Sequence, residues 1–123
     1  MSELPDVELQ RNGRVVLAHL QGEVDISCVE DLRARLVGSL DNRDLGLVVD
    51  LTAASYLDSA GINMLFELAE ALGRRQIRLA AVVPDEGIVA RVASLVSLDS
   101  ALPVHHSADD AVKAVEKGPG AGE

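Results

Sequence analysis

The chain has 123 residues, the length of a single domain, and carries 11 basic against 20 acidic residues for a formal net charge of -9. Its hydrophobic fraction of 48% and charged fraction of 25% are typical of a folded globular protein. The aromatic residues are Tyr56 and Phe66, and tryptophan is absent. Nucleic-acid binding needs positive charge against phosphates and, for single strands, aromatic stacking surfaces. The composition therefore excludes direct nucleic-acid binding and favours a protein partner.

Cys28 is the single cysteine, which rules out an internal disulfide and a multi-cysteine zinc site. We expect its side chain to be buried and to act as a small apolar group. The acidic N-terminus does not resemble a secretory signal. The apolar runs at 45–49 and 79–83 fall far short of the ~20 residues that span a bilayer. No glycine-rich phosphate-binding motif occurs. We expect a cytoplasmic protein without a membrane span, metal or cofactor.

The first part of the chain predicts a β-hairpin and then a helix. Apolar and polar residues alternate around Asn12 and Gly13, a pair that favours a tight turn because both positions must tolerate positive φ. Ser27 and Glu30 then have the spacing of a capping box. The apolar face of the helix is formed by Val29, Leu32, Leu36, Val37 and Leu40.

The central part predicts a strand buried on both faces at 45–51, a loop at 52–58 and a second helix. Gly73 is the expected stop of this helix. Its core-facing stripe is formed by Ile62, Leu65, Phe66, Ala69 and Leu72.

The last part predicts another buried strand at 77–83 and a third helix opened by Asp85 or Glu86. We expect a short edge strand at 102–104 and a final helix capped by Ser107. The inward-facing residues of the third helix are expected to be Ile88, Val89, Val92, Leu95 and Val96.

This order of elements predicts one α/β domain with about four helices. Its mixed sheet is parallel in the centre and antiparallel at the first hairpin. We expect the domain over residues 7–117, with an N-terminal tail at 1–6 and a disordered C-terminal tail at 118–123.

Residues 47–61 are the most informative segment, because they run from the end of a buried strand to the start of a helix. Functional sites collect at the carboxyl ends of strands in open α/β sheets. Asp58 and Ser59 lie where the helix begins, beside unpaired N–H groups and the positive end of its dipole. The simplest interpretation is that one of them is an N-cap.

The segment also resembles the signature of STAS domains, and in particular of bacterial anti-sigma factor antagonists. That signature is a strand ending in Asp-Leu-Ser/Thr, followed after a loop by an apolar residue and Asp-Ser-Ser/Thr/Ala-Gly-Leu. The chain has Asp50-Leu51-Thr52 and Leu57-Asp58-Ser59-Ala60-Gly61-Ile62. Upstream, Gly22-Glu23-Val24-Asp25 resembles the family's Gly-Glu-Leu/Ile-Asp. Ile62 replaces the usual Leu and Asn63 a common Gly, and both departures leave the serine in place.

The resemblance implies a phosphoprotein that acts by partner switching in transcription regulation and stress response. An anti-sigma factor with serine kinase activity would phosphorylate Ser59. The unmodified form would bind the anti-sigma factor and free the sigma factor, and a PP2C-type phosphatase would reset the switch. The motif residues that support this are Gly22, Glu23, Asp25 and Asp50. The expected partner-binding residues are Thr52, Ser55, Tyr56, Asp58, Ser59, Ala60, Gly61, Asn63, Asp85 and Glu86.

Three alternatives remain open. A serine hydrolase would need a Gly-x-Ser-x-Gly elbow and a positioned base, which Ser59 lacks in the sequence, so we expect no enzymatic activity. A response-regulator receiver with Asp50 as phosphoacceptor would need an acidic pair after its first strand, where this chain has a hairpin. A STAS domain that is an accessory of a transporter, a stressosome-like scaffold or a small-ligand binder would share the fold and the serine.

Overall fold

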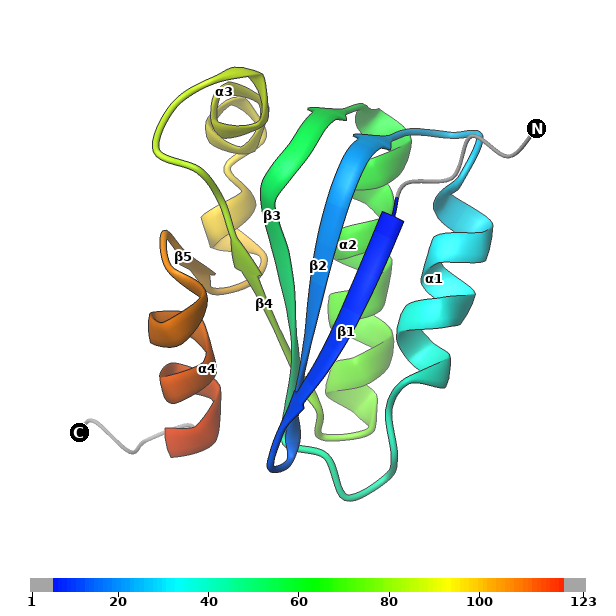
Figure 1. Ribbon diagram of the computed structural model, residues 1–123, viewed down its shortest axis with the longest axis vertical. Helices are drawn as coiled ribbons and strands as arrows, with labels where there is room; N and C mark the ends of the chain where they lie inside the picture. The colour runs from blue at the N-terminus through cyan, green and yellow to red at the C-terminus, as the bar shows by residue number, and fades with distance from the viewer. Residues whose placement is uncertain (1–5, 119–123) are drawn as a thin grey trace.

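The computed structural model describes residues 6–118, which form a five-stranded sheet in the order β1-β2-β3-β4-β5 (Figure 1). β1 (Asp6–Asn12) pairs antiparallel with β2 (Val15–Val24). The strands β3 (Gly46–Leu57), β4 (Arg78–Val82) and β5 (Val104–His105) then add in parallel. The mixed α/β sheet with an antiparallel first hairpin is thereby confirmed. Apart from Asp6 and Gly118, the predicted tails lie outside the described residues, and the domain boundaries stay a prediction.

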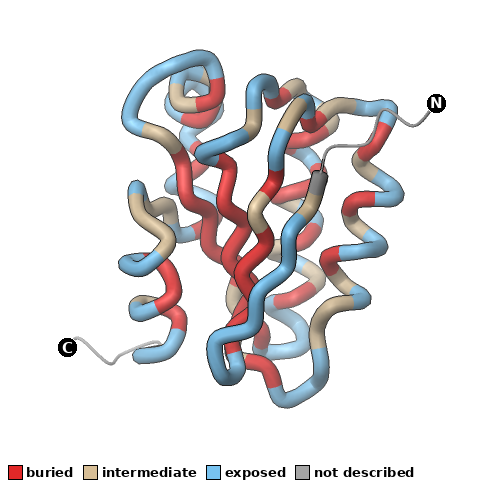
Figure 2. Tube along the Cα trace, viewed as in Figure 1, coloured by how far each residue is buried: buried red, intermediate tan, exposed pale blue. Residues whose placement is uncertain are grey.

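Helices cover both faces of the sheet (Figure 1). The helices α1 (Val29–Gly38), α2 (Ser59–Arg74) and α3 (Ile88–Leu95) pack on one face, and α4 (Ala108–Lys117) packs on the other. A 3-10 turn, η1 (Leu98–Ser100), follows α3. Alternate strand residues divide between the two cores, so that Val49 faces α1 and α2 whereas Val48 faces α4. Figure 2 shows the central strands buried over most of their length, with exposure increasing toward the edge where β2 and β3 end.

The predicted loop at 52–58 is wrong, because β3 continues to Leu57. The extra residues pair with the end of β2, where Glu23 lies opposite Tyr56 and Val24 opposite Leu57. Two register irregularities interrupt this pairing, and Gly22 takes a φ of 96° beside one of them. A positive φ of this kind is easy for glycine and strained for other residues. Gly22 therefore lets β2 stay paired with the long end of β3.

Two helix boundaries also differ from the prediction. α1 begins at Val29 without a side-chain cap, because the Ser27 hydroxyl donates to Asp25 Oδ1 at 2.6 Å instead of accepting from the helix. α2 continues through Gly73 to Arg74, and Gln76 supplies the left-handed residue after it, with φ 62°. The cap predicted for the last helix is confirmed, since the Ser107 side chain accepts from the backbone N–H of Asp110.

The predicted inward face of α3 is correct for Val89 but wrong for Ile88, Leu95 and Val96. These three side chains are exposed, Leu95 to 77%. The helix starts at Ile88 after Gly87, and neither acidic residue before it caps it. Among residues 6–118, no helix is long and apolar enough to cross a membrane.

Candidate functional site

Most residues of the two motifs, Asp50 and Thr52 excepted, lie at one edge of the sheet, where the parallel strands β2, β3 and β4 end (Figure 1). The chain leaves β2 into α1, β3 into α2 and β4 into α3 at this edge. The segments that carry Asp25, Asp58 and Asp85 therefore meet there, although they are far apart in the sequence. This placement agrees with the usual position of sites in open α/β sheets.

Asp58 is the N-cap of α2, which confirms the capping interpretation for this residue. Its Oδ1 accepts from the backbone N–H of Gly61 at 3.0 Å, and its Oδ2 accepts from the backbone N–H of Ile26 at 3.3 Å. The Asp58 backbone N–H donates to the Val24 carbonyl at 3.2 Å. One residue thus ties the end of β2, the loop that follows it and the start of α2 together.

Ser59 is the first residue of α2 and is exposed. Its hydroxyl forms no hydrogen bond with another described residue, because Asp58 takes the capping role. A free hydroxyl at a helix N-terminus is open to a modifying enzyme. A phosphate placed there would also meet the positive end of the helix dipole.

Gly61 is buried and is required by packing inside the domain. A Cβ at this position would lie 2.7 Å from Leu57 Cδ1 and 3.0 Å from the Val24 carbonyl oxygen. The first turn of α2 can therefore approach the ends of β2 and β3 only with a glycine here. Gly61 itself faces the protein interior, so the accessible surface comes from its neighbours.

The other expected partner-binding residues fall into three places. Ser55, Tyr56 and Asn63 are exposed around the start of α2, and Ala60 is half-buried among them. Asp85 and Glu86 are exposed in the loop before α3. Thr52 lies farther back along β3.

Thr52 belongs to a cluster around Asp50, which is one of the buried charged residues. The Thr52 hydroxyl and backbone N–H both donate to Asp50 Oδ1, at 2.7 and 3.0 Å. The other carboxylate oxygen accepts from His19 Nδ1 at 2.7 Å, and His19 Nε2 lies 3.2 Å from Gln10 Oε1. Asp50 and His19 therefore hold β1, β2 and β3 together.

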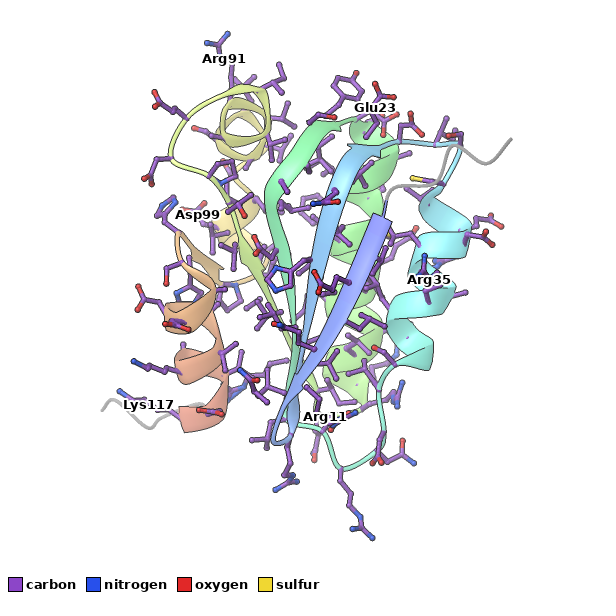
Figure 3. All side chains as sticks on the ribbon, in the orientation of Figure 1. Arg11, Glu23, Arg35, Arg91, Asp99 and Lys117 are labelled. Atoms are coloured by element: carbon purple, nitrogen blue, oxygen red, sulfur yellow. The ribbon has the colours of Figure 1, made fainter. Side chains whose placement is uncertain are left out.

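The upstream motif shapes the loop between β2 and α1. Asp25 Oδ1 accepts from the Ser27 backbone N–H at 3.0 Å, and the Asp25 carbonyl accepts from the Cys28 N–H. Glu23 is exposed at the edge where α2 begins, as Figure 3 shows. Cys28 is buried as expected, and its burial raises the pKa of the thiol, with a smaller contribution from the nearby carboxylate of Asp25.

Sequence reasoning missed Ile26, which is 77% exposed in this loop. Tyr56 is 44% and Ile88 48% exposed at the same edge. The available signal was an isoleucine directly after Gly22-Glu23-Val24-Asp25, outside the periodic pattern of the following helix. These three residues lie in the segments where β2 and β3 end and where α3 begins after β4. A contiguous exposed apolar patch is a feature of binding surfaces.

Comparisons with known proteins agree with this arrangement. Residues 6–111 match the STAS domain family. A crystal structure of an anti-sigma factor antagonist from Mycobacterium paratuberculosis is 26% identical, with 91% of this chain and 94% of that chain covered and a TM-score of 0.77.

Two more distant structures share the fold. The unphosphorylated anti-sigma factor antagonist SpoIIAA is 18% identical over 92% of this chain and 99% of that chain, with a TM-score of 0.67. The phosphorylated form of SpoIIAA from Bacillus is 19% identical over 89% of this chain and 99% of that chain, with a TM-score of 0.55. The murine anion transporter Slc26a9 is 18% identical over 89% of this chain and 19% of the transporter chain, with a TM-score of 0.74. No curated protein matches. Because the family match spans most of the sequence, the chain belongs to the STAS domain family.

Proposed function

We propose that this protein is an anti-sigma factor antagonist whose unphosphorylated form binds an anti-sigma factor and releases the sigma factor in the cytoplasm. Phosphorylation of Ser59 ends that binding, and a PP2C-type phosphatase restores it. The observation that carries the proposal is the exposed hydroxyl of Ser59 at the first residue of α2, next to the capping side chain of Asp58.

At the position of Ser59, a phosphate is expected to leave the fold intact but to weaken partner binding. A phosphoserine adds about -1.5 to -2 charge at pH 7. At a helix N-terminus this charge is stabilised by the free amides and the dipole, so the domain keeps its structure. At an interface the same charge has to lose its water, which costs several kcal/mol when no partner group compensates.

The phosphate transfer itself gives a reason for release. For transfer, the kinase has to bring the γ-phosphate of ATP to the Ser59 hydroxyl. The bond from Ser59 Oγ to phosphorus forms, the bond from phosphorus to ADP breaks, and a base on the kinase takes the hydroxyl proton. The phosphoserine then faces ADP phosphates across the interface, and the like charges repel.

An acyl-transfer role for Ser59 has no support in the geometry. A serine nucleophile needs a base within hydrogen-bond reach. His19 is engaged with Asp50 on β3, and His106 Nδ1 lies 2.9 Å from the Val83 carbonyl. The role of an accessory domain remains the second candidate, because Slc26a9 contains the same fold.

The test is to incubate the purified protein with ATP and each kinase-type anti-sigma factor from the same organism, and to map phosphate by mass spectrometry. We expect stoichiometric phosphate on Ser59 with one of them. Ser59→Ala should abolish the modification, and Ser100→Ala, which changes an exposed serine in η1 outside the expected binding surface, should leave it intact. Absence of phosphate on Ser59 with every one of these kinases would favour the accessory role.

A further inference from the structure

We propose that Ile26 and the groove between α1 and α2 are the apolar anchor of the partner interface and receive an apolar side chain of the anti-sigma factor bordered by basic residues. This inference rests on the proposed function and extends it to residues outside the phosphorylation motif. It makes Ile26 a residue that determines which anti-sigma factor is bound.

The backbone around Ile26 holds the side chain in solvent. Its N–H donates to Asp58 Oδ2 at 3.3 Å. The next residue, Ser27, is fixed by Asp25 Oδ1 through both its N–H and its hydroxyl, at 3.0 and 2.6 Å. An isoleucine that is 77% exposed on such a constrained loop loses little conformational freedom on binding. Preorganisation of this kind is expected of an anchor residue.

A groove of about 230 Å³ lies beside Ile26. Val29 from α1 and Ala60 and Met64 from α2 provide apolar walls. Arg33 of α1 bridges to Glu67 of α2, with Nη1 2.9 Å from Oε1, and both residues line the groove. Glu30 and Asn63 complete the lining, so the groove is apolar only in part and has room for a single side chain of the partner.

The charged residues around the groove indicate which charges the partner should carry at the border of the interface. Glu23, Glu30 and Asp31 are exposed at this end of the domain, and Asp25 is half-buried. Arg33 is the basic residue that lines the groove, and it is paired with Glu67. The net negative rim therefore complements lysine or arginine residues around the incoming apolar side chain.

The groove and the phosphorylation site belong to one surface. Ala60 lines the groove and directly follows Ser59 in α2, and Asp58 contacts the Ile26 backbone. A partner large enough to bring ATP to Ser59 therefore covers Ile26 as well. This continuity favours the anti-sigma factor over a second copy of the chain as the occupant.

The experiment measures the affinity of unphosphorylated wild type, Ile26→Ser and Leu9→Ser for the anti-sigma factor that phosphorylates Ser59, by calorimetry. Leu9 is the control, because it is another exposed aliphatic residue, at 43%, but lies on β1 opposite Ala18 and away from the carboxyl end of β2. We expect Ile26→Ser to weaken binding about tenfold or more, as loss of a buried aliphatic side chain does. Leu9→Ser should bind like wild type, and Glu30→Gln should reduce the salt dependence of the affinity.

Equal affinities for Ile26→Ser and wild type would overturn the inference while leaving the proposed function intact. A wild-type protein that binds none of the organism's anti-sigma factors would overturn both. Analytical ultracentrifugation of the same variants tests the other possible occupant of the groove, a second copy of the chain. If Ile26→Ser abolished a wild-type dimer and left the affinity for the anti-sigma factor unchanged, the groove would be a contact between copies.

Discussion

Asp58 and Ile26 are joined by a hydrogen bond of 3.3 Å, so the carboxylate that caps α2 also holds the loop that follows β2. The expected cost of Asp58→Ala is about 1 kcal/mol of unfolding free energy from the lost cap. The variant should also lose hydrogen-exchange protection at the Ile26 amide. Ser107→Ala removes the equivalent cap of α4 and is the control. It should destabilise the protein by a similar amount, as measured by urea unfolding, and leave the Ile26 amide protected.

Unchanged protection of the Ile26 amide in Asp58→Ala would contradict this coupling. Asp58→Asn gives a second check, because its side-chain oxygen can still accept from the Gly61 amide. It should recover most of the cap's stability.

Gly61 and Gly73 are both helical glycines of α2 but should respond to alanine in opposite directions. A Cβ at Gly61 would collide with Leu57 and Val24, and overpacking of this kind costs about 1–3 kcal/mol. A Cβ at Gly73 meets nothing within 4 Å. Gly73→Ala should therefore stabilise the protein by about 0.5–1 kcal/mol through helix propensity. Urea unfolding measures the change in unfolding free energy of the two variants. Equal destabilisation by both would show that contact with Leu57 and Val24 does not explain the need for glycine at position 61.

Arg11 and Asp44 form an ion pair that should make stability depend on pH in acid. Arg11 Nη1 and Nη2 donate to the two carboxylate oxygens, at 2.6 and 3.1 Å, and this pairing lowers the pKa of Asp44. A carboxyl with a lower pKa in the folded state stabilises the protein above its unfolded pKa of about 4 and loses that stabilisation as the pH falls through the folded value. The urea concentration at which half of the wild type is unfolded should therefore decrease as the pH is lowered from neutral to about 3.

Arg11→Gln tests the origin of this dependence. Without the guanidinium, the folded and unfolded pKa values of Asp44 lie closer together, so the fall in urea midpoint should be smaller. Arg43→Gln is the control, because the exposed Arg43 lies in the same loop and does not pair with Asp44. If the urea midpoint decreased equally at acid pH in wild type and Arg11→Gln, the decrease would come from carboxyl groups other than Asp44.

Cys28 should be an unreactive thiol in the folded protein. The side chain is 1% exposed, and burial raises its pKa, so little thiolate is present at pH 8. Alkylation by iodoacetamide should be at least about tenfold slower in buffer than in concentrated urea. Equal rates in the two solvents would show that the start of α1 opens readily.

The sequence predicted the elements whose local and tertiary signals agree. Asn12 and Gly13 mark the hairpin, and Gly13 has the positive φ of 63° that the turn needs. Ser107 caps α4 as expected, because its short side chain can reach an orphan amide from the N-cap position. The motif around Asp58 and Ser59 was placed correctly at the start of a helix, which located the candidate site.

The errors occurred where the outcome depends on residues distant in the chain. The extension of β3 over 52–57 depends on pairing with the end of β2, which no local pattern reveals. The spacing of apolar residues in α3 identified a helix, but it could not show that Leu95 is left exposed by the rest of the fold. The burial of Asp44 likewise depends on its ion pair with Arg11, 33 positions earlier.

The control of partner binding by Ser59 is tested most directly by comparing the affinities of Ser59-phosphorylated and unmodified protein for the same anti-sigma factor, with circular dichroism as the check on the fold. We expect the phosphorylated form to bind at least about 100-fold more weakly, the consequence of placing an uncompensated dianion in the interface, while its spectrum is unchanged. Equal affinities of the two forms would contradict the claim that the charge at Ser59 controls partner binding.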